Sequence, residues 1–287
     1  MTTAVSTVVQ VRVPARSAAG ELRAIKIVWE REVVRFASDR LRMITSLVQP
    51  LLFLFVLGSG LSEVASAGTA GLDFRTFLYP GILAMAVMFT AIFSAASIVW
   101  DREFGFLREM LVAPIRRSSI VIGKCLGGAT VATFQGVLVI ALAGLVGVPY
   151  SVPLMLEILV MLTVLAYTLT AFGVMVAARI KQIQSFMALT QVLMMPLFFV
   201  SGAVFPVTGL PTWLAVLNRI DPLTYAVDPM RRAVFAHLDV TPAVREHLAP
   251  GVTWAGWQVP SLVCAGVVAA LGVIMTAVAI AEFNHSD

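Results

Sequence analysis

MITSLVQPLLFLFVLGSGLS, residues 43–62, is a run of twenty amino acids without a charge, bounded by Arg42 and Glu63. A helix needs about 20 apolar residues to cross the hydrocarbon core of a bilayer, because each residue advances the helix by about 1.5 Å. The run therefore predicts a membrane-spanning helix over residues 43–62.

The rest of the chain has the same character. Of its 287 residues, 59% are hydrophobic and only 13% are charged, whereas a soluble domain has about 25% charged residues. Helices of soluble proteins keep one polar face, so repeated uncharged runs exclude the soluble class. The net charge of +4 comes from basic residues beside apolar runs, which indicates membrane topology and not nucleic-acid binding.

Five further spans follow the first. The uncharged run from Cys125 to Leu156 is too long for one helix, and we divide it at the turn GVPYSVP, residues 147–153. Trp254 and Trp257 precede the last span, where their rings favour the membrane interface. The sequence predicts an all-α integral membrane protein with spans at about 43–62, 76–100, 119–146, 154–178, 183–204 and 259–281, which together form a permease domain over residues 43–287.

The distribution of Lys and Arg predicts the orientation. Residues 1–42 hold eight, the loop after the second span with Lys124 holds five, and the loop after the fourth holds two; the opposite side holds five. Because basic residues concentrate in cytoplasmic loops, we expect both termini in the cytoplasm and the chain in the cell (inner or plasma) membrane. Cys125 and Cys264 then lie toward opposite faces, so no disulfide is expected.

The N-terminal region divides into two parts. Residues 1–18 lack a cleavable apolar segment and are expected to form a disordered cytoplasmic tail. Residues 19–42 predict an amphipathic helix, with polar Arg23, Glu30, Arg31 and Arg35 opposite an apolar stripe of Leu22, Ile25, Trp29, Val33 and Phe36. Such a helix either anchors the chain along the membrane surface or docks a partner.

Two loops differ from ordinary connectors. The outer loop, residues 205–258, contains helix-like pieces at Phe205–Leu217 and Leu223–Ala236, separated by a predicted turn at residues 218–222. At about 13 residues each, they suit re-entrant or interfacial helices, although a surface loop without a transport role is the alternative. The inner loop, residues 101–118, predicts a short helix ended by Pro114, either a force-transmitting element or a solvated connector.

Several stretches carry a family resemblance: FLYPGIL at residues 77–83, REFGFLREMLVAP at 102–114, SGAVFP at 201–206 and NRIDPLTY at 218–225. With this layout, the chain from about Ala24 to its end resembles permease subunits of the ABC-2 type exporter family, particularly those grouped with daunorubicin- and doxorubicin-resistance transporters.

The resemblance implies a dimer of six-span permeases, homologous or identical, with one ATPase subunit docked under each. It implies that residues 19–42 form a connecting helix beside the ATPase, and that the outer-loop helices partly re-enter the membrane. ATP and Mg would be bound by the partner, and this chain would bind no cofactor and catalyse no reaction. An ATPase-coupling loop would include Asp101, Arg102, Glu103, Phe104, Gly105, Arg108, Glu109 and Met110.

Two features of the sequence agree with a separate ATPase. A P-loop requires Gly-x-x-x-x-Gly-Lys-Ser/Thr, but Gly123-Lys124 is followed by Cys125 and preceded five positions earlier by Ser118. The spans also lack the central acidic or histidine residues that ion-coupled carriers use, which disfavours an ion-driven carrier. A membrane enzyme acting on lipid is disfavoured as well, because His237, His247 and His285 form no His-Glu-x-x-His motif and none lies in a span.

The substrate is the least determined feature. Gln135, Tyr167 and Gln191 are polar positions within spans and predict a path for an amphipathic substrate, with simple interhelical hydrogen bonds as the alternative. We expect a hydrophobic or amphipathic, drug-like or lipid-like substrate to be exported across the lipid bilayer. The alternative is a lipid-linked glycan or polysaccharide.

Overall fold

A computed structural model describes residues 17–62, 73–105, 115–207, 210–254 and 256–285. Within these ranges, six helical segments are long and apolar enough to cross a membrane, namely Met43–Gly60, Phe74–Glu103, Arg117–Ile140, Val152–Arg179, Ile183–Val200 and Ser261–His285. This confirms the predicted all-helical class and the six spans. The expected tail falls almost wholly outside the described residues.

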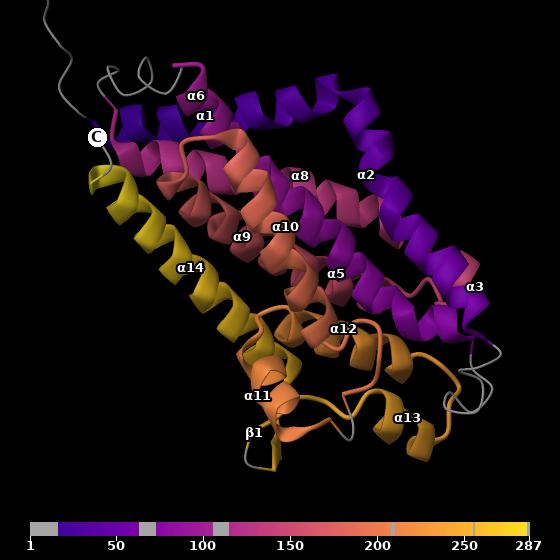
Figure 1. The fold of residues 1–287 in the computed structure, drawn as a ribbon. Helices are drawn as coiled ribbons and strands as arrows, with labels where there is room; N and C mark the ends of the chain where they lie inside the picture. The colour runs from indigo at the N-terminus through magenta and orange to yellow at the C-terminus, as the bar shows by residue number, and fades with distance from the viewer. Residues whose placement is uncertain (1–16, 63–72, 106–114, 208–209, 255, 286–287) are drawn as a thin grey trace, which may run out of the picture.

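The N-terminal helix lies across one end of the bundle. Helix α1 (Ala18–Ser38) begins at Ser17, whose Oγ accepts a hydrogen bond from the Gly20 amide at 3.1 Å. Asp39 ends it, and α2 (Arg40–Leu52) then turns down the bundle and continues through a π-helical turn η1 (Phe53–Leu57) into α3 (Gly58–Gly60) (Figure 1). The predicted single helix over residues 19–42 is therefore divided at Asp39, and residues 40–42 belong to α2, the helix that leads into the first span.

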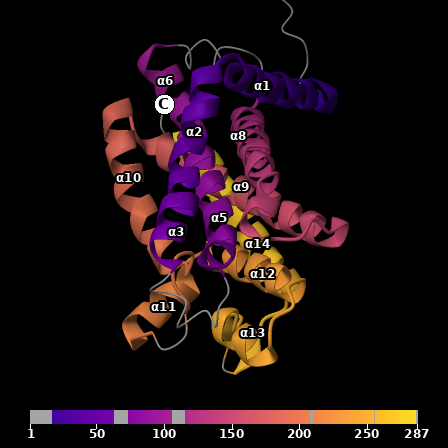
Figure 2. The same cartoon turned by 90° about the vertical axis from the view of Figure 1, so that its right-hand side faces the viewer.

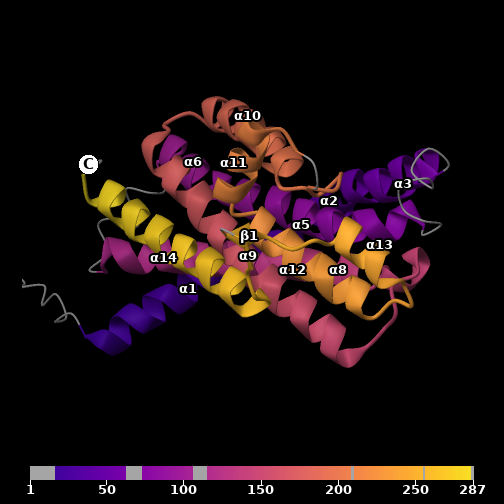
Figure 3. The ribbon, with the colours of Figure 1, turned by 90° about the horizontal axis from the view of Figure 1, so that it is seen from below.

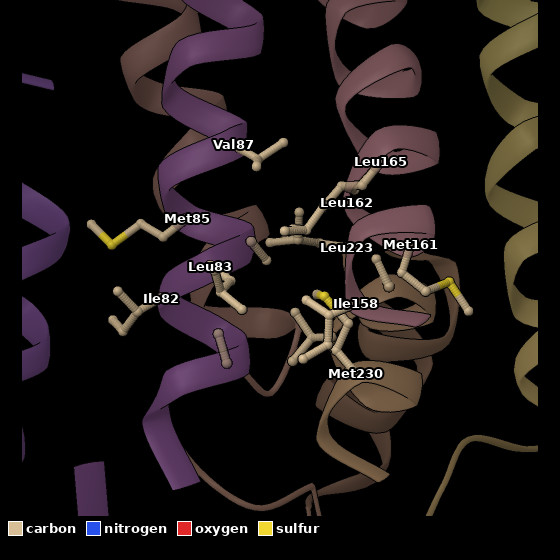
Figure 4. Packing of buried hydrophobic residues seen from close by; sticks show 14 of the residues in the cluster. Ile82, Leu83, Met85, Val87, Ile158, Met161, Leu162, Leu165, Leu223 and Met230 are labelled. Carbon is tan, nitrogen blue, oxygen red and sulfur yellow. The ribbon is translucent and has the colours of Figure 1, made fainter. Parts of the chain in front are cut away.

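Three spans form the core of the bundle. They are α5 (Phe74–Ser94) with its continuation α6 (Ala96–Glu103), α8 (Arg117–Ile140) and α9 (Val152–Arg179), which pack against one another. Leu83 and Val87 of α5 point toward Leu162 and Leu165 of α9, with Met230 below them (Figure 4). Helices α5 and α9 are apolar on nearly all sides, which is typical of helices buried among others. A 3₁₀ turn η2 (Ala143–Val146) and Gly147 at φ +74° separate α8 from α9.

The remaining spans flank this core. Few residues of these spans are buried. In the most apolar 18-residue stretch, the buried share of residues is 22% for α10 (Ile183–Val200), 28% for α14 (Ser261–His285) and 17% for the first span, compared with 83% for the second span. Their apolar side chains are therefore free to contact lipid or another protein. The α14 C-terminus lies at the same end of the bundle as α1 (Figure 2).

The opposite end, called here the α12 end, is capped by short elements. They are α11 (Thr212–Ile220), α12 (Thr224–Ala236), α13 (Pro242–Leu248) and a hairpin of β1 (Thr253–Trp254) with β2 (Trp257–Gln258). Helix α12 lies across α5 and α9 (Figure 3). The helix expected from Phe205 starts only at Thr212, after Pro211, and the expected turn at 218–222 starts only after Ile220. Helix α13 and the hairpin were not predicted.

Candidate functional site

Helix α1 packs closely on α8 because two glycines leave room for it. A Cβ atom on Gly123 would lie 2.7 Å from Cβ of Val28, and one on Gly127 would lie 2.6 Å from Cβ of Glu32. Small residues spaced four apart let two helices approach in this way. A hydrogen bond also joins the two helices, because the indole N–H of Trp29 donates to Thr130 Oγ1 at 3.0 Å.

The buried face of α1 differs from the expected stripe by a small rotation. Its buried residues, spaced four apart, are Ala24, Val28, Glu32 and Phe36. Leu22 is 67% exposed, whereas Ile25, Trp29 and Val33 lie at the edge of the contact. The rotation places a carboxylate, Glu32, in the centre of the contact with α8.

Glu32 belongs to a buried cluster of charges at the α1 end. Lys124 of α8 donates to Glu32 Oε1 at 2.6 Å, to Asp101 Oδ2 of α6 at 2.7 Å and to Ser97 Oγ at 3.0 Å. Arg31 Nη2 lies 2.7 Å from Asp101 Oδ1. The side chains of Lys124, Glu32 and Asp101 are 2%, 7% and 4% exposed. The Arg31 side chain is 41% exposed, so buried Lys124 and this partly exposed cation together balance the two carboxylates and join α1, α6 and α8.

The last turn of α6 also holds α9 and α10. Arg102 donates to the carbonyl oxygens of Ala177, Ala178 and Ile180, at 3.2, 3.0 and 2.8 Å. These carbonyls end α9, where a cation is favourable because it satisfies groups without an intrahelical partner. Glu103 Oε2 accepts from the Ile183 amide at 3.2 Å, at the start of α10. Side chains of three consecutive residues, 101–103, thus contact four other helices.

The predicted coupling residues therefore divide into three groups. Asp101, Arg102 and Glu103 are turned toward neighbouring helices. Phe104 is 72% exposed, and Gly105 follows it with φ +82°. Arg108, Glu109 and Met110 lie outside the described residues. A cavity of about 380 Å³ opens beside this turn, between Trp100 and Phe104 of the span and Arg31, Val34 and Arg35 of α1.

The α12 end has its own buried cation, Arg231 of α12. Its guanidinium lies 4.1 Å from the ring centroid of Phe77, and Nη2 donates to the Ala203 carbonyl at 3.1 Å. Burial lowers the pKa of Arg231 to about 10, and the charge of Asp228 opposes the shift. A Cβ on Gly81 would lie 2.7 Å from Cβ of Ala203. The stretches FLYPGIL and SGAVFP are therefore in contact, with Arg231 joining them.

The NRIDPLTY stretch joins the same assembly. Asn218 Nδ2 donates to the Val200 carbonyl at 2.7 Å and to Thr224 Oγ1 at 3.1 Å. Asp221 Oδ1 accepts from the Leu223 amide at 2.9 Å, while burial raises the pKa of Asp221 to about 7. A cavity of about 180 Å³ opens beside Asn218, Asp228 and Arg231.

The predicted path residues do not share one environment. Gln135 is fully buried in α8, and neither amide atom has a hydrogen-bond partner among the described residues. The Tyr167 hydroxyl of α9 is 3.0 Å from Thr276 Oγ1 of α14, and Gln191 lies on the exposed face of α10. A continuous path through these three positions stays a prediction. No group of three or more metal-binding side chains occurs in the described part of the chain.

Sequence reasoning missed the partners of Lys124 and the role of Arg231. The signal for Glu32 was its place in the row Ala24, Val28, Glu32 and Phe36, where an acid interrupts small and apolar residues. The sequence around Arg231 gave no comparable signal. The outer helices are short, so the spacing of apolar and polar residues along them is too brief to predict which face is buried.

Comparison with known proteins gives consistent matches. The sequence pattern of the family described as ABC-2 type transporter matches residues 23–235. The chain is 30% identical over 216 residues to nodulation protein J of Rhizobium leguminosarum bv. trifolii, covering 73% of this chain and 80% of that one. It is 24% identical over 218 residues to the inner membrane transport permease YadH of Escherichia coli K12, covering 76% and 85%. It is 31% identical over 159 residues to the probable multidrug ABC transporter permease YbhR of the same strain, covering 55% and 43%.

Proposed function

This chain belongs to the ABC-2 type transporter family as a transport permease subunit, and we propose that it forms the membrane path of an exporter whose ATP hydrolysis occurs on a separate ABC ATPase. Two copies of this permease, or one copy with a homologous permease, form the transporter, with one ATPase for each. Both chain termini lie in the cytoplasm. The excess of Lys and Arg in the loops at the α1 end supports that orientation.

The observation that carries the coupling role is the set of contacts at residues 101–103. Asp101 is paired with Lys124 and Arg31, Arg102 caps α9, and Glu103 contacts the start of α10. A displacement of this turn therefore acts on α1, α8, α9 and α10 together. Charge-assisted hydrogen bonds are strong and directional, so they are suited to move these helices as one body.

We infer that the ATPase engages residues 101–110, including exposed Phe104. Nucleotide-driven movement of the ATPase would shift the last turn of α6. The buried charges would transmit that shift to the spanning helices. Their movement would change which side of the membrane the substrate path opens to. Arg231, Phe77 and Ala203 would hold the α12 end closed until the shift arrives, because they join three elements there.

The substrate proposed here is an uncharged or weakly polar amphiphile, drug-like or lipid-like. The flanking spans present apolar surfaces, and one relative is named as a multidrug permease. Export of a lipid-linked glycan or polysaccharide is the second candidate, and an ion-coupled carrier is a less favoured one.

Co-purification tests the coupling role. The tagged chain is purified from membranes in which it is expressed together with its ABC ATPase, and the bound ATPase is quantified. We expect Phe104→Ala and Glu103→Arg each to reduce the bound ATPase by roughly tenfold, the factor that corresponds to the loss of about 1.4 kcal/mol of binding energy. Glu246→Arg, on the exposed face of α13 at the other end, is the matched control.

Phe104→Ala is the more decisive variant, because an exposed side chain contributes little to folding, whereas Glu103 has an internal contact. Normal ATPase binding and normal ATP hydrolysis in the Phe104→Ala variant would remove this turn from the coupling mechanism.

A further inference from the structure

A cavity of about 260 Å³ lies between the end of α1, the second half of α2 and the last turns of α5. Helix α2 contacts α5, and Figure 2 draws the two next to each other. Its lining residues are uncharged: Phe36, Thr45, Ser46, Gln49, Pro50, Phe89, Thr90 and Phe93. The cavity therefore combines three aromatic rings with a few small polar groups, the composition typical of sites for small organic molecules.

The backbone of α2 is irregular where it borders this cavity. Pro50 lies inside the helix and has no amide hydrogen, so the carbonyl oxygen of Ser46 loses the donor that an uninterrupted helix would supply. The π-helical turn Phe53–Leu57 follows directly, and such turns occur frequently at functional sites. Both Ser46 and Pro50 line the cavity.

A second, independent observation comes from Thr90 on the facing helix. Several helical threonines bond their hydroxyls within their own helix, as Thr163 does with the Leu159 carbonyl and Thr190 with the Phe186 carbonyl. Thr90, like Thr133 of α8, does not. Thr90 is only 7% exposed, and its hydroxyl has no hydrogen-bond partner among the described residues. A buried hydroxyl without a partner is unfavourable, so a ligand in the cavity would gain by bonding to it.

We propose that this cavity is a substrate-binding site within one protomer, which takes the aromatic or branched apolar end of an uncharged amphiphile and hydrogen-bonds its polar group through Thr90. Its volume is below the range of about 300–1,000 Å³ for pockets that enclose a whole ligand, so the rest of the molecule lies outside it. The described residues of the lining carry no charge, so a strongly ionic group is disfavoured there, because an unpaired charge is costly to bury. The assignment rests on the proposed transport function and names its substrate class.

The test is photolabelling of the purified full-length chain in lipid nanodiscs. The probe is N-decyl-4-benzoylbenzamide, which is uncharged and has one amide, an alkyl tail and a photoreactive aromatic ketone. Trypsin separates the two walls of the cavity into fragments 43–75 and 76–102, which mass spectrometry distinguishes from fragments of α10 and α14. We expect labelling of 43–75 and 76–102 that is saturable and is competed by non-photoreactive N-decylbenzamide.

Variants at Thr90 distinguish the site from lipid-like partitioning. Thr90→Phe fills the cavity and should abolish the saturable label. Thr90→Val keeps the shape and should lower the apparent affinity by roughly fivefold, the factor expected for one lost hydrogen bond. Thr163→Phe, at an exposed position of α9, is the matched control and should leave labelling unchanged.

Labelling of all spans without saturation would overturn the site and identify lipid-like partitioning as the source of the label. Saturable labelling unaffected by Thr90→Phe would also overturn it, because the probe would then bind elsewhere. This measurement does not involve the ATPase. Absence of saturable labelling together with normal ATPase co-purification would therefore reject the cavity as a binding site and leave the proposed transporter function standing. Saturable labelling together with loss of ATPase binding would support the cavity and reject the proposed coupling to an ATPase.

Discussion

Replacement of Lys124 should lower the stability of the folded chain most strongly, because its ammonium is the shared partner of two buried carboxylates. Lys124→Met would leave Glu32 and Asp101 close together, with Arg31 still paired with Asp101. Breaking a buried ion pair typically costs about 3–5 kcal/mol. We expect a fall in the apparent Tm of the detergent-purified chain, measured by thermal unfolding.

A double variant distinguishes the ion cluster from simple loss of packing. Lys124→Met with Glu32→Gln restores charge balance around Asp101 and Arg31, so the pair should be more stable than Lys124→Met alone. Lys26→Met breaks only the exposed pair with Glu30 and should change little, since such pairs contribute about 0–1 kcal/mol. Additive effects of the two buried substitutions would contradict the cluster.

Asp221 should make stability depend on pH. Burial raises its pKa in the folded protein to about 7 from 3.8. Between these values the unfolded chain releases this proton while the folded chain retains it, so rising pH favours unfolding across this window. We expect the apparent Tm to fall from pH 5 to pH 8, and Asp221→Asn to reduce that fall. Because Asp228 is buried beside Arg232 and its pKa is also raised, a residual slope should remain. An unchanged slope in Asp221→Asn would mean that Asp221 does not titrate in this window.

At the scale of elements, the close contact of α1 with α8 depends on Gly127. Gly127→Val would place a side chain against Glu32 and push α1 away from α8. We expect amide hydrogen exchange in α1 to become at least about tenfold faster, since 1.4 kcal/mol of lost local stability gives that factor. Gly266→Val on α14, where a Cβ would meet nothing within 4 Å, is the control. Equal protection of α1 in both variants would show that α1 does not need this contact.

The same contact shows how far sequence reasoning reached. Uncharged runs sufficed for the spans, because bilayer thickness fixes helix length independently of neighbours. The buried face of α1 is offset from the expected apolar stripe, because α8 presents two glycines and a lysine to it. The break at Asp39 and the hairpin at Trp254 and Trp257 depend on tertiary contacts that no local period encodes. For the candidate site, the turn at 101–103 was located from the sequence, but its inward partners were not.

For the whole molecule, orientation decides which end meets the ATPase. Six spans place α1 and the C-terminus at one end, and the charge count predicts that this end is cytoplasmic. Asp239, between α12 and α13, is exposed at the opposite end, so a cysteine there should react with an impermeant maleimide added to intact cells. A cysteine at Lys181, exposed between α9 and α10, should react only after permeabilisation. Cys125 and Cys264 are buried and should give little background. The reverse labelling pattern would invert the orientation, place residues 101–110 outside the cell and leave them unable to meet a cytoplasmic ATPase.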